Sequence, residues 1–197
     1  MALFTTQPTI LETARLYVSE LSPEIYLQLV NEGSDKEIMA YLGLSAREEI
    51  KIEKEKVAKG ITSYFVTFKN FRLLDKVTGN VIGRCDFHTW IQKHRRAEIG
   101  YHLIDDSYKN KGLMTEALGA VLVFGFENMN LHRIEALIAE HNEPSRRLLE
   151  HYGFSREGIL RQHYYINDVN EDSIMFSLTR SDYELLKEHW SLVAGQV

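Results

Sequence analysis

The sequence predicts a single-domain α/β (α+β) fold in which helices flank a mixed sheet of about six or seven strands. The first observation is that segments with the two-residue period of a strand and segments with a helical period follow one another. The second is their order, which lacks the regular alternation of a fully parallel fold. The third is the length of 197 residues, which suits one domain. One domain is therefore expected over residues 1–197, with its core at about 10–180 and a last helix at 181–192.

The first elements expected are a strand and three helices. Residues 15–21 alternate apolar and polar side chains, as in a strand with one buried face. Ser22 and Pro23 then begin a helix, since serine is a common N-cap and proline is accepted in the first turn. Two Ser-x-x-Glu sequences match the reciprocal capping box and predict two more helices. They are Ser34 with Glu37, and Ser45 with Glu48 in front of a helix at 46–59.

Aromatic and β-branched residues mark the middle of the chain. Residues 63–90 contain two such runs separated by Thr78, Gly79 and Asn80, as in a hairpin. Apolar residues at helical spacing then predict a helix at 113–128 that packs against a sheet. The other elements expected, in order, are strands at 97–104 and 133–140, a helix at 142–152 closed by Gly153, strands near 155–166 and 172–179, and a last helix capped by Ser181 and Glu184.

Composition argues against several classes of protein. A net charge of −5 and a pI near 5.9 disfavour nucleic-acid binding and suit a cationic substrate such as an amine. The sequence has neither a signal peptide nor an apolar run long enough to span a membrane. Cys85 is the only cysteine, which excludes an internal disulfide and fits a cytoplasmic protein. Cys85 is either a buried small residue or a nucleophile, and no neighbour marks it as a nucleophile.

The most informative segment is a strand at 98–103 followed, within 108–117, by a short turn and the start of the helix at 113–128, which is entered through Gly112. Lys109, Lys111 and Gly112 stand where a first helical turn offers unpaired backbone N–H groups. These groups and the helix dipole attract phosphate, so a cofactor with a pyrophosphate is expected. The spacing is neither that of a nucleoside-triphosphate loop nor that of G-x-G-x-x-G.

The turn resembles the acetyl-CoA-binding motif of the Gcn5-related N-acetyltransferases (GNAT), Gln/Arg-x-x-Gly-x-Gly/Ala. Lys109 and Met114 stand at its ends and depart from it in type, although a terminal methionine is familiar in one branch of the family. Four further sequences, in the right order, resemble the branch of bacterial ribosomal-protein N-terminal acetyltransferases (RimJ/RimL-like). They are Asp86-Phe87-His88-x-Trp90, His94-Arg95-Arg96-Ala97-Glu98-Ile99-Gly100-Tyr101, Asn142-x-x-Ser145 and Gly153-Phe154-x-x-Glu157-Gly158.

The resemblance covers about residues 10–180 and implies a fold in which parallel strands 97–104 and 133–140 splay apart around the pantetheine arm. It implies direct transfer of an acetyl group from acetyl-CoA to a primary amine in a ternary complex, with CoA as product and no metal. The acceptor is a protein N-terminal α-amine or a small molecule, no nucleic acid or membrane partner is expected, and a homodimer is left open. The residues expected to bind acetyl-CoA are Leu103, Ile104, Lys109, Asn110, Lys111, Gly112, Leu113, Met114, Thr115, Asn142 and Ser145.

Acetyl transfer makes demands on the strand that contains Gly100. A neutral amine attacks the thioester carbonyl, and backbone N–H groups at an expected bulge after Gly100 would stabilise the oxyanion. Alternation puts Glu98, Gly100 and His102 on one face, where Glu98 serves the amine as a base or as an anchor for its positive charge. The alternative for Glu98 is an ion pair with Arg95 or Arg96.

A proton must also reach the departing thiolate. Many acetyltransferases use a tyrosine seven residues after the position of Asn142, but Leu149 stands there and cannot donate a proton. The Rim-type branch implies Ser145 as the acid, and its alternative is a plain helix-start serine. For Asn142 two roles stay open, a bond to the pantetheine, as the resemblance implies, and the N-cap of its helix.

Four residues are expected in the acceptor pocket. His88 and Trp90 are two apart in one strand and are expected on the same face, where His88 is a proton relay or a hydrogen-bonded structural residue. Tyr164 and Tyr165 line the pocket or pack within their strand. A glutamate implicated in one Rim-type subgroup aligns near Tyr164, so that base cannot be carried over.

The lack of an obvious strong base bears on the acceptor. An α-amine has a pKa near ~8 and a lysine amine near ~10.4, and this gap corresponds to roughly 3 kcal/mol of deprotonation cost. The site therefore fits an α-amine better than a protein lysine. Two other classes stay open, a non-catalytic acyl-CoA-binding or regulatory domain and an unrelated nucleotide-binding α/β protein.

Overall fold

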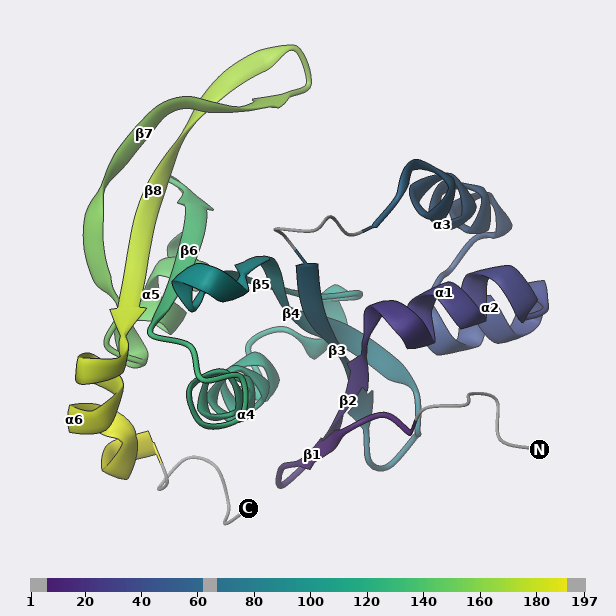
Figure 1. Cartoon of the computed structure of the whole chain (residues 1–197), viewed down its shortest axis with the longest axis horizontal. Helices are drawn as coiled ribbons and strands as arrows, with labels where there is room; N and C mark the ends of the chain where they lie inside the picture. The colour runs from purple at the N-terminus through teal and green to yellow at the C-terminus, as the bar shows by residue number, and fades with distance from the viewer. Residues whose placement is uncertain (1–6, 62–66, 191–197) are drawn as a thin grey trace.

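The computed structural model describes residues 7–61 and 67–190, which fold around an eight-stranded sheet (Figure 1). The strand order is β1-β2-β3-β4-β5-β6-β8-β7. The strands are β1 (Ile10–Glu12), β2 (Leu16–Leu21), β3 (Thr67–Asp75), β4 (Val81–Ile91), β5 (Arg96–Leu103), β6 (Arg133–Ala139), β7 (Ser155–Ile166) and β8 (Val169–Thr179). The α-helices are α1 (Pro23–Glu32), α2 (Asp35–Leu42), α3 (Arg47–Lys59), α4 (Leu113–Glu127), α5 (Glu143–His151) and α6 (Arg180–Trp190), and short 3₁₀ helices cover Gln92–His94 and Asp106–Tyr108.

Two neighbouring parallel strands, β5 and β6, separate as predicted. They pair only from Arg96 opposite Arg133 to Glu98 opposite Glu135. Beyond that point β5 stays paired with β4 as far as Leu103, while β6 stays paired with β8 along its whole length. A gap therefore opens between β5 and β6 toward their C-terminal ends.

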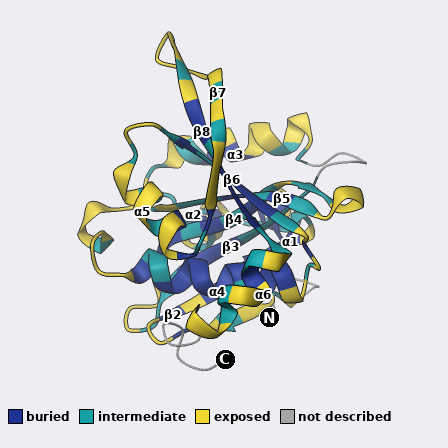
Figure 2. Ribbon diagram, turned by 90° about the vertical axis from the view of Figure 1, so that its left-hand side faces the viewer, coloured by how far each residue is buried: buried dark blue, intermediate teal, exposed yellow. Residues whose placement is uncertain are grey.

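Helices cover both faces of the sheet (Figure 1). α4 packs against β2, β4 and β5, and α6 packs on α4 and β8. Figure 2 shows α4 as largely buried, because it joins strand residues such as Phe87 and Ala97 in the main hydrophobic core. α1, α2 and α3 form a second cluster around Leu29 and Ile38. Among the described residues, no helix is both long enough and apolar enough to cross a membrane.

Most of the predicted elements are confirmed, and the sheet has one strand more than the upper expected number. The additional strand is β1, a three-residue strand at the edge of the described sheet, where it pairs with β2. Three residues show no periodicity, so the pattern that predicts 15–21 does not extend to them. The predicted stretch at 63–90 and the last helix at 181–192 reach partly outside the described residues, at 63–66 and 191–192.

The start of α3 lies one residue later than predicted. Ala46 is the N-cap, and Glu49 rather than Glu48 accepts hydrogen bonds from the backbone N–H groups of Ser45 and Ala46. The carboxylate of a capping box must stand three residues after the N-cap, so a one-residue shift exchanges the two glutamates.

The start of α6 is displaced in the other direction. Thr179 and Asp182 rather than Ser181 and Glu184 form the reciprocal bonds, because the helix begins at Arg180. Sequence spacing identified a capping box near both helices, but neighbouring polar residues left its register open.

Candidate active site

α4 begins without a side-chain cap. Gly112 at its N-terminus has left-handed backbone angles (φ 71°, ψ 8°), which favour glycine. Ser22, Ser34 and Asn142 by contrast cap α1, α2 and α5 with their own side-chain oxygens. The first N–H groups of α4 are therefore open to an anionic ligand, at the end of the helix where the dipole favours negative charge.

Arg15 and Glu116 fasten this turn to β2, and sequence reasoning missed both. Glu116 is buried in the first turn of α4 and accepts from Thr13 Oγ1 at 2.5 Å, Arg15 N at 2.6 Å and Arg15 Nε at 2.7 Å. Burial raises the pKa of Glu116, but these hydrogen bonds outweigh it and hold the pKa below its ordinary value. Arg15 Nη1 also donates to the carbonyl of Lys111 at 2.8 Å. Arg15 therefore fixes the backbone at the residue directly before Gly112.

The two lysines of the turn differ in their surroundings. Lys109 is exposed and pairs with Asp106, with 2.5 Å between Nζ and Oδ1. Lys111 is exposed and has no ion-pair partner among the described residues. The other predicted cofactor residues here are Leu103 at the end of β5, the exposed Ile104, Asn110 with φ 57°, the buried Leu113, and the half-buried Met114 and Thr115.

α5 begins beyond the C-terminal end of β6. Asn142 Oδ1 accepts the backbone N–H of Ser145 at 3.2 Å, so Asn142 is the N-cap of this helix. Ser145 is half-buried, and Leu149 is fully buried in the core. Tyr101 lies on the opposite face of β5 from Glu98, and its hydroxyl donates to the carbonyl of Ser145 at 3.5 Å. Burial raises the pKa of Tyr101 to about 12, so its hydroxyl keeps its proton at neutral pH.

Glu98 pairs with His88, its direct neighbour on β4, with 3.2 Å between Oε1 and Nε2. The alternative prediction, an ion pair of Glu98 with Arg95 or Arg96, is wrong. Arg95 binds Asn130, and Arg96 binds Glu135 at 2.6 Å.

The hydrogen bond to Glu98 raises the pKa of His88, against the effect of partial burial. Asp86 lies two residues before His88, and burial raises its pKa to about 6. Asp86, His88 and Glu98 thus lie on one face of β4 and β5, the polar face, which also carries Arg84 and His102.

Gly100 makes room for the ring of His88. A Cβ atom at Gly100 would lie 3.0 Å from His88 Cε1, so a side chain there would displace the imidazole. The expected bulge after Gly100 is wrong, because β5 pairs with β4 without a register shift from Glu98 to Leu103. The irregularity lies in β4 instead, around Thr89, whose φ is 49°.

This bulge also overturns the expectation that His88 and Trp90 share a face. One extra residue in a strand inverts the alternation of the side chains that follow it. Trp90 accordingly packs against the main core that contains Phe87, whereas His88 lies on the other face beside Glu98. Trp90 is therefore not part of the polar face.

The two tyrosines of β7 that were expected in the acceptor pocket, Tyr164 and Tyr165, have different surroundings. Partial burial raises the pKa of Tyr164, and the nearby carboxylate of Glu98 raises it further. Tyr165 is 67% exposed and donates to Asp168 at 2.9 Å, within the hairpin of β7 and β8. Cys85 is fully buried, and burial raises the pKa of its thiol well above the ordinary value, so it does not serve as a nucleophile.

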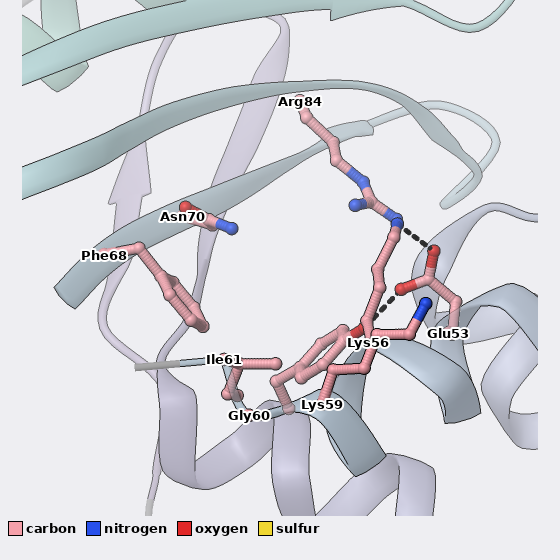
Figure 3. Close-up of a pocket in the computed structure, with 9 residues that line it drawn as sticks. Glu53, Lys56, Lys59, Gly60, Ile61, Phe68, Asn70 and Arg84 are labelled. Carbon is pink, nitrogen blue, oxygen red and sulfur yellow. Dashed lines mark hydrogen bonds and ion pairs between the residues drawn. The ribbon is translucent and has the colours of Figure 1, made fainter. Parts of the chain in front are cut away.

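A pocket of about 390 Å³ opens between α1, α3, β3 and β4 (Figure 3). Its lining includes Arg84, which lies on the same face of β4 as His88. It also includes Tyr26, whose hydroxyl donates to the buried carboxylate of Glu53. Sequence reasoning missed these residues, because they come together only when α1, α3, β3 and β4 pack against one another.

Comparison with known proteins gives consistent results. The chain matches the model of the acetyltransferase (GNAT) domain over residues 15–155. It is 34% identical over 176 residues to the uncharacterized N-acetyltransferase YoaA of Bacillus subtilis (strain 168), covering 87% of this chain and 97% of that protein. It is 32% identical over 96 residues to the spermidine N(1)-acetyltransferase of Escherichia coli (strain K12), and the match covers 49% of this chain and 50% of that protein. Its fold is similar to the crystal structure of ribosomal-protein-S5-alanine acetyltransferase from Vibrio fischeri, with a TM-score of 0.63 at 22% identity over 89% of this chain and 98% of that chain.

Proposed function

The chain belongs to the acetyltransferase (GNAT) family and is an N-acetyltransferase, and we propose that it uses acetyl-CoA to acetylate the N-terminal α-amine of a peptide. The observation that carries the proposal is the uncapped start of α4 beside the gap between β5 and β6. Membership of an enzyme family excludes the unrelated nucleotide-binding class considered from the sequence.

The residues around this gap fit acetyl-CoA. The free N–H groups of α4 and the charge of Lys111 would hold the pyrophosphate, and Arg15 would keep the turn in shape through the Lys111 carbonyl. The gap between β5 and β6 is the place for the pantetheine arm, with Asn142 and Ser145 at its far side. When bound there, acetyl-CoA supplies the acetyl thioester that the amine attacks.

The pair formed by His88 and Glu98 is the proton acceptor of this proposal. A peptide α-amine must lose a proton to attack, and the pair lies on the polar face directly beside Gly100. The raised pKa of His88 supports this role, because a base works best when its pKa lies near the operating pH. Glu98 holds the imidazole in place and compensates its charge.

Ser145 is the proposed proton donor to the departing thiolate. Its position in the first turn of α5, at the edge of the gap, supports this assignment. Tyr101 is the second candidate, because its protonated hydroxyl contacts the Ser145 backbone. The variants Ser145→Ala and Tyr101→Phe each remove only the side-chain hydroxyl, and their kinetics distinguish the two candidate proton donors.

The acceptor is proposed to be an α-amine because its lower pKa demands less of the base than a lysine amine does. A polyamine is the second candidate, since one relative is named a spermidine N(1)-acetyltransferase. The proposed place of action is the cytoplasm, which the single buried thiol of Cys85 supports.

A second copy of the chain is the proposed protein partner. β7 is the last strand of the sheet, and an open edge favours pairing with another strand. The hairpin of β7 and β8 extends away from the body (Figure 1) and exposes Tyr165, Ile166 and Val169. Light scattering should give the molar mass of a homodimer for the wild-type protein. The variant Val169→Lys should shift the measured mass toward that of the monomer. A monomeric wild-type protein would contradict the proposed dimer.

The direct test is release of CoA from acetyl-CoA with a panel of N-terminal peptides, lysine-containing peptides whose N-terminus is blocked, and polyamines. We expect turnover with free peptide N-termini and little with blocked peptides. Tight binding of acetyl-CoA without turnover of any amine would instead favour a non-catalytic acyl-CoA-binding domain.

A further inference from the structure

The pocket between α1, α3, β3 and β4 contains one carboxylate whose charge is already compensated. Glu53 is buried, pairs with Lys56 at 2.7 Å and accepts the hydroxyl of Tyr26. Figure 3 shows Glu53 and Lys56 on one side of the pocket. Burial and Glu53 raise the pKa of Tyr26, so the hydroxyl stays protonated and remains a donor to Glu53. Glu53 is therefore not free to bind a cation.

The other polar side chains of the pocket include the donors of Arg84, Lys59 and Asn70. Within the described part of the chain, neither Arg84 nor Lys59 forms an ion pair with a carboxylate, although the charge of Arg84 counteracts the effect of burial on the pKa of the neighbouring Asp86. Arg84 makes one hydrogen bond, from Nη2 to the carbonyl of Leu42 at 3.1 Å. Asn70 points its amide nitrogen into the pocket (Figure 3). Burial lowers the pKa of Arg72 to about 10, and the charge of Arg84 adds to this effect. Two cations and an amide donor make a site for an anion.

The register of the sheet relates this site to the reacting groups. Arg84, Asp86 and His88 lie on one face of β4, opposite His102, Gly100 and Glu98 respectively. At about 3.3 Å per residue, Arg84 lies roughly 7 Å from the level of Gly100 and roughly 13 Å from the level of His88. An extended peptide covers these distances in about two to four residues.

We propose that this pocket binds a carboxylate of the acceptor, so that the enzyme selects peptides with an acidic side chain at positions two to four. The inference rests on the acetyl transfer to peptide α-amines proposed above. A polyamine would place a second positive charge against Arg84 and Lys59, which is unfavourable. A free amino acid with an acidic side chain has the right charge but is too short to reach both sites.

The test compares acceptors that differ only in charge. Peptides of one length carry Glu, Gln or Lys at position two, three or four, and spermidine and free glutamate complete the set. We expect kcat/KM at the best position to be at least tenfold higher for Glu than for Gln, and lowest for Lys. Lys59→Met and Arg84→Met should each remove most of the preference, and Arg84→Glu should reverse it in favour of Lys. The KM for acetyl-CoA should stay unchanged.

Lys51→Met is the matched control, because Lys51 is an exposed lysine of α3 outside the pocket and should leave the preference intact. Arg84 also binds the end of α2, so Lys59→Met keeps the proposal testable if Arg84 variants do not fold. Equal turnover of Glu and Gln peptides, or a preference for spermidine or for free glutamate, would overturn the inference. Absence of turnover with every amine would instead contradict the proposed function itself.

Discussion

The two faces of β4 and β5 are made by alternate residues of the same strands, yet they differ in almost every property. One face is apolar and fully or nearly fully buried, and contributes Cys85, Phe87, Ala97 and Ile99 to the main core. The other carries Arg84, Asp86, His88, Glu98 and His102. Charged groups on a sheet face cost free energy unless they are paired, and on this face Glu98 has its partner in His88. The comparison shows that the apolar face stabilises the packing of the strands, whereas the polar face supplies the groups of the proposed active site.

The largest expected effect on stability comes from the apolar face. Phe87→Ala removes a fully buried ring that lies against α4, where the Cβ position of Gly125 is only 2.5 Å from Phe87 Cζ. We expect the free energy of unfolding to fall by about 3–5 kcal/mol. The matched change on the polar face is His88→Ala, which should cost stability far less because His88 is half-exposed. Denaturant titration of both variants checks this, and equal losses would abolish the contrast between the faces.

The largest kinetic effect apart from the base is expected at Ser145. If Ser145 protonates the thiolate, Ser145→Ala should lower kcat by about 10²–10⁴-fold with little change in the KM for acetyl-CoA. Tyr101→Phe is the companion variant, because Tyr101 belongs to the apolar side of β5 yet reaches Ser145. A loss below about threefold in Ser145→Ala with a large loss in Tyr101→Phe would transfer the acid role to the tyrosine.

A smaller effect is expected at the turn before α4. Gly112→Val forces a β-branched residue into a left-handed conformation and crowds the proposed phosphate site, so the affinity for acetyl-CoA should fall at least tenfold. Gly79→Val is the matched control, since Gly79 has the same φ of 71° and nothing within 4 Å of its Cβ position. Isothermal titration with CoA separates them. Equal affinity in both variants would refute the role of the turn.

The smallest expected effect concerns Arg15. Arg15→Lys keeps the charge but cannot keep both the contact with Glu116 and the hydrogen bond to the Lys111 carbonyl. Loss of one such bond, about 0.5–1.5 kcal/mol, predicts a rise of roughly two- to tenfold in the KM for acetyl-CoA at constant kcat. Steady-state kinetics measures this, and a fall in kcat alone would be inconsistent with a role in holding the turn.

Sequence patterns predicted the elements of this fold well because strands and helices have fixed periods. Alternation predicted that Glu98, Gly100 and His102 share one face of their strand, and in the structure Glu98 lies on the polar face while Ala97 and Ile99 on the other face are buried. These periodic patterns did not predict contacts between residues that are far apart in the sequence. Arg15 meets Glu116 at a sequence separation of 101 residues, and no local spacing encodes that contact.

Small irregularities defeated the finer predictions. One extra residue at Thr89 moved Trp90 to the core side, and a one-residue shift exchanged Glu48 for Glu49 in a cap. The roles predicted for Ser145, Asn142 and the acetyl-CoA residues remain predictions, because they depend on ligands. Local periodicity therefore carries fold information, whereas site chemistry depends on register and packing.

The measurement that tests the central claim most directly is the pH dependence of kcat/KM for a peptide acceptor in the wild-type enzyme and in Glu98→Gln. If the pair of His88 and Glu98 accepts the proton, activity requires its deprotonated form and falls as the pH drops through the pKa of His88. Glu98 holds that pKa above its ordinary value, so Glu98→Gln should lower it and move the acidic limb to lower pH. We predict this shift together with a loss of activity at the optimum and nearly unchanged acetyl-CoA affinity. Normal turnover of Glu98→Gln with an unshifted acidic limb would contradict the account.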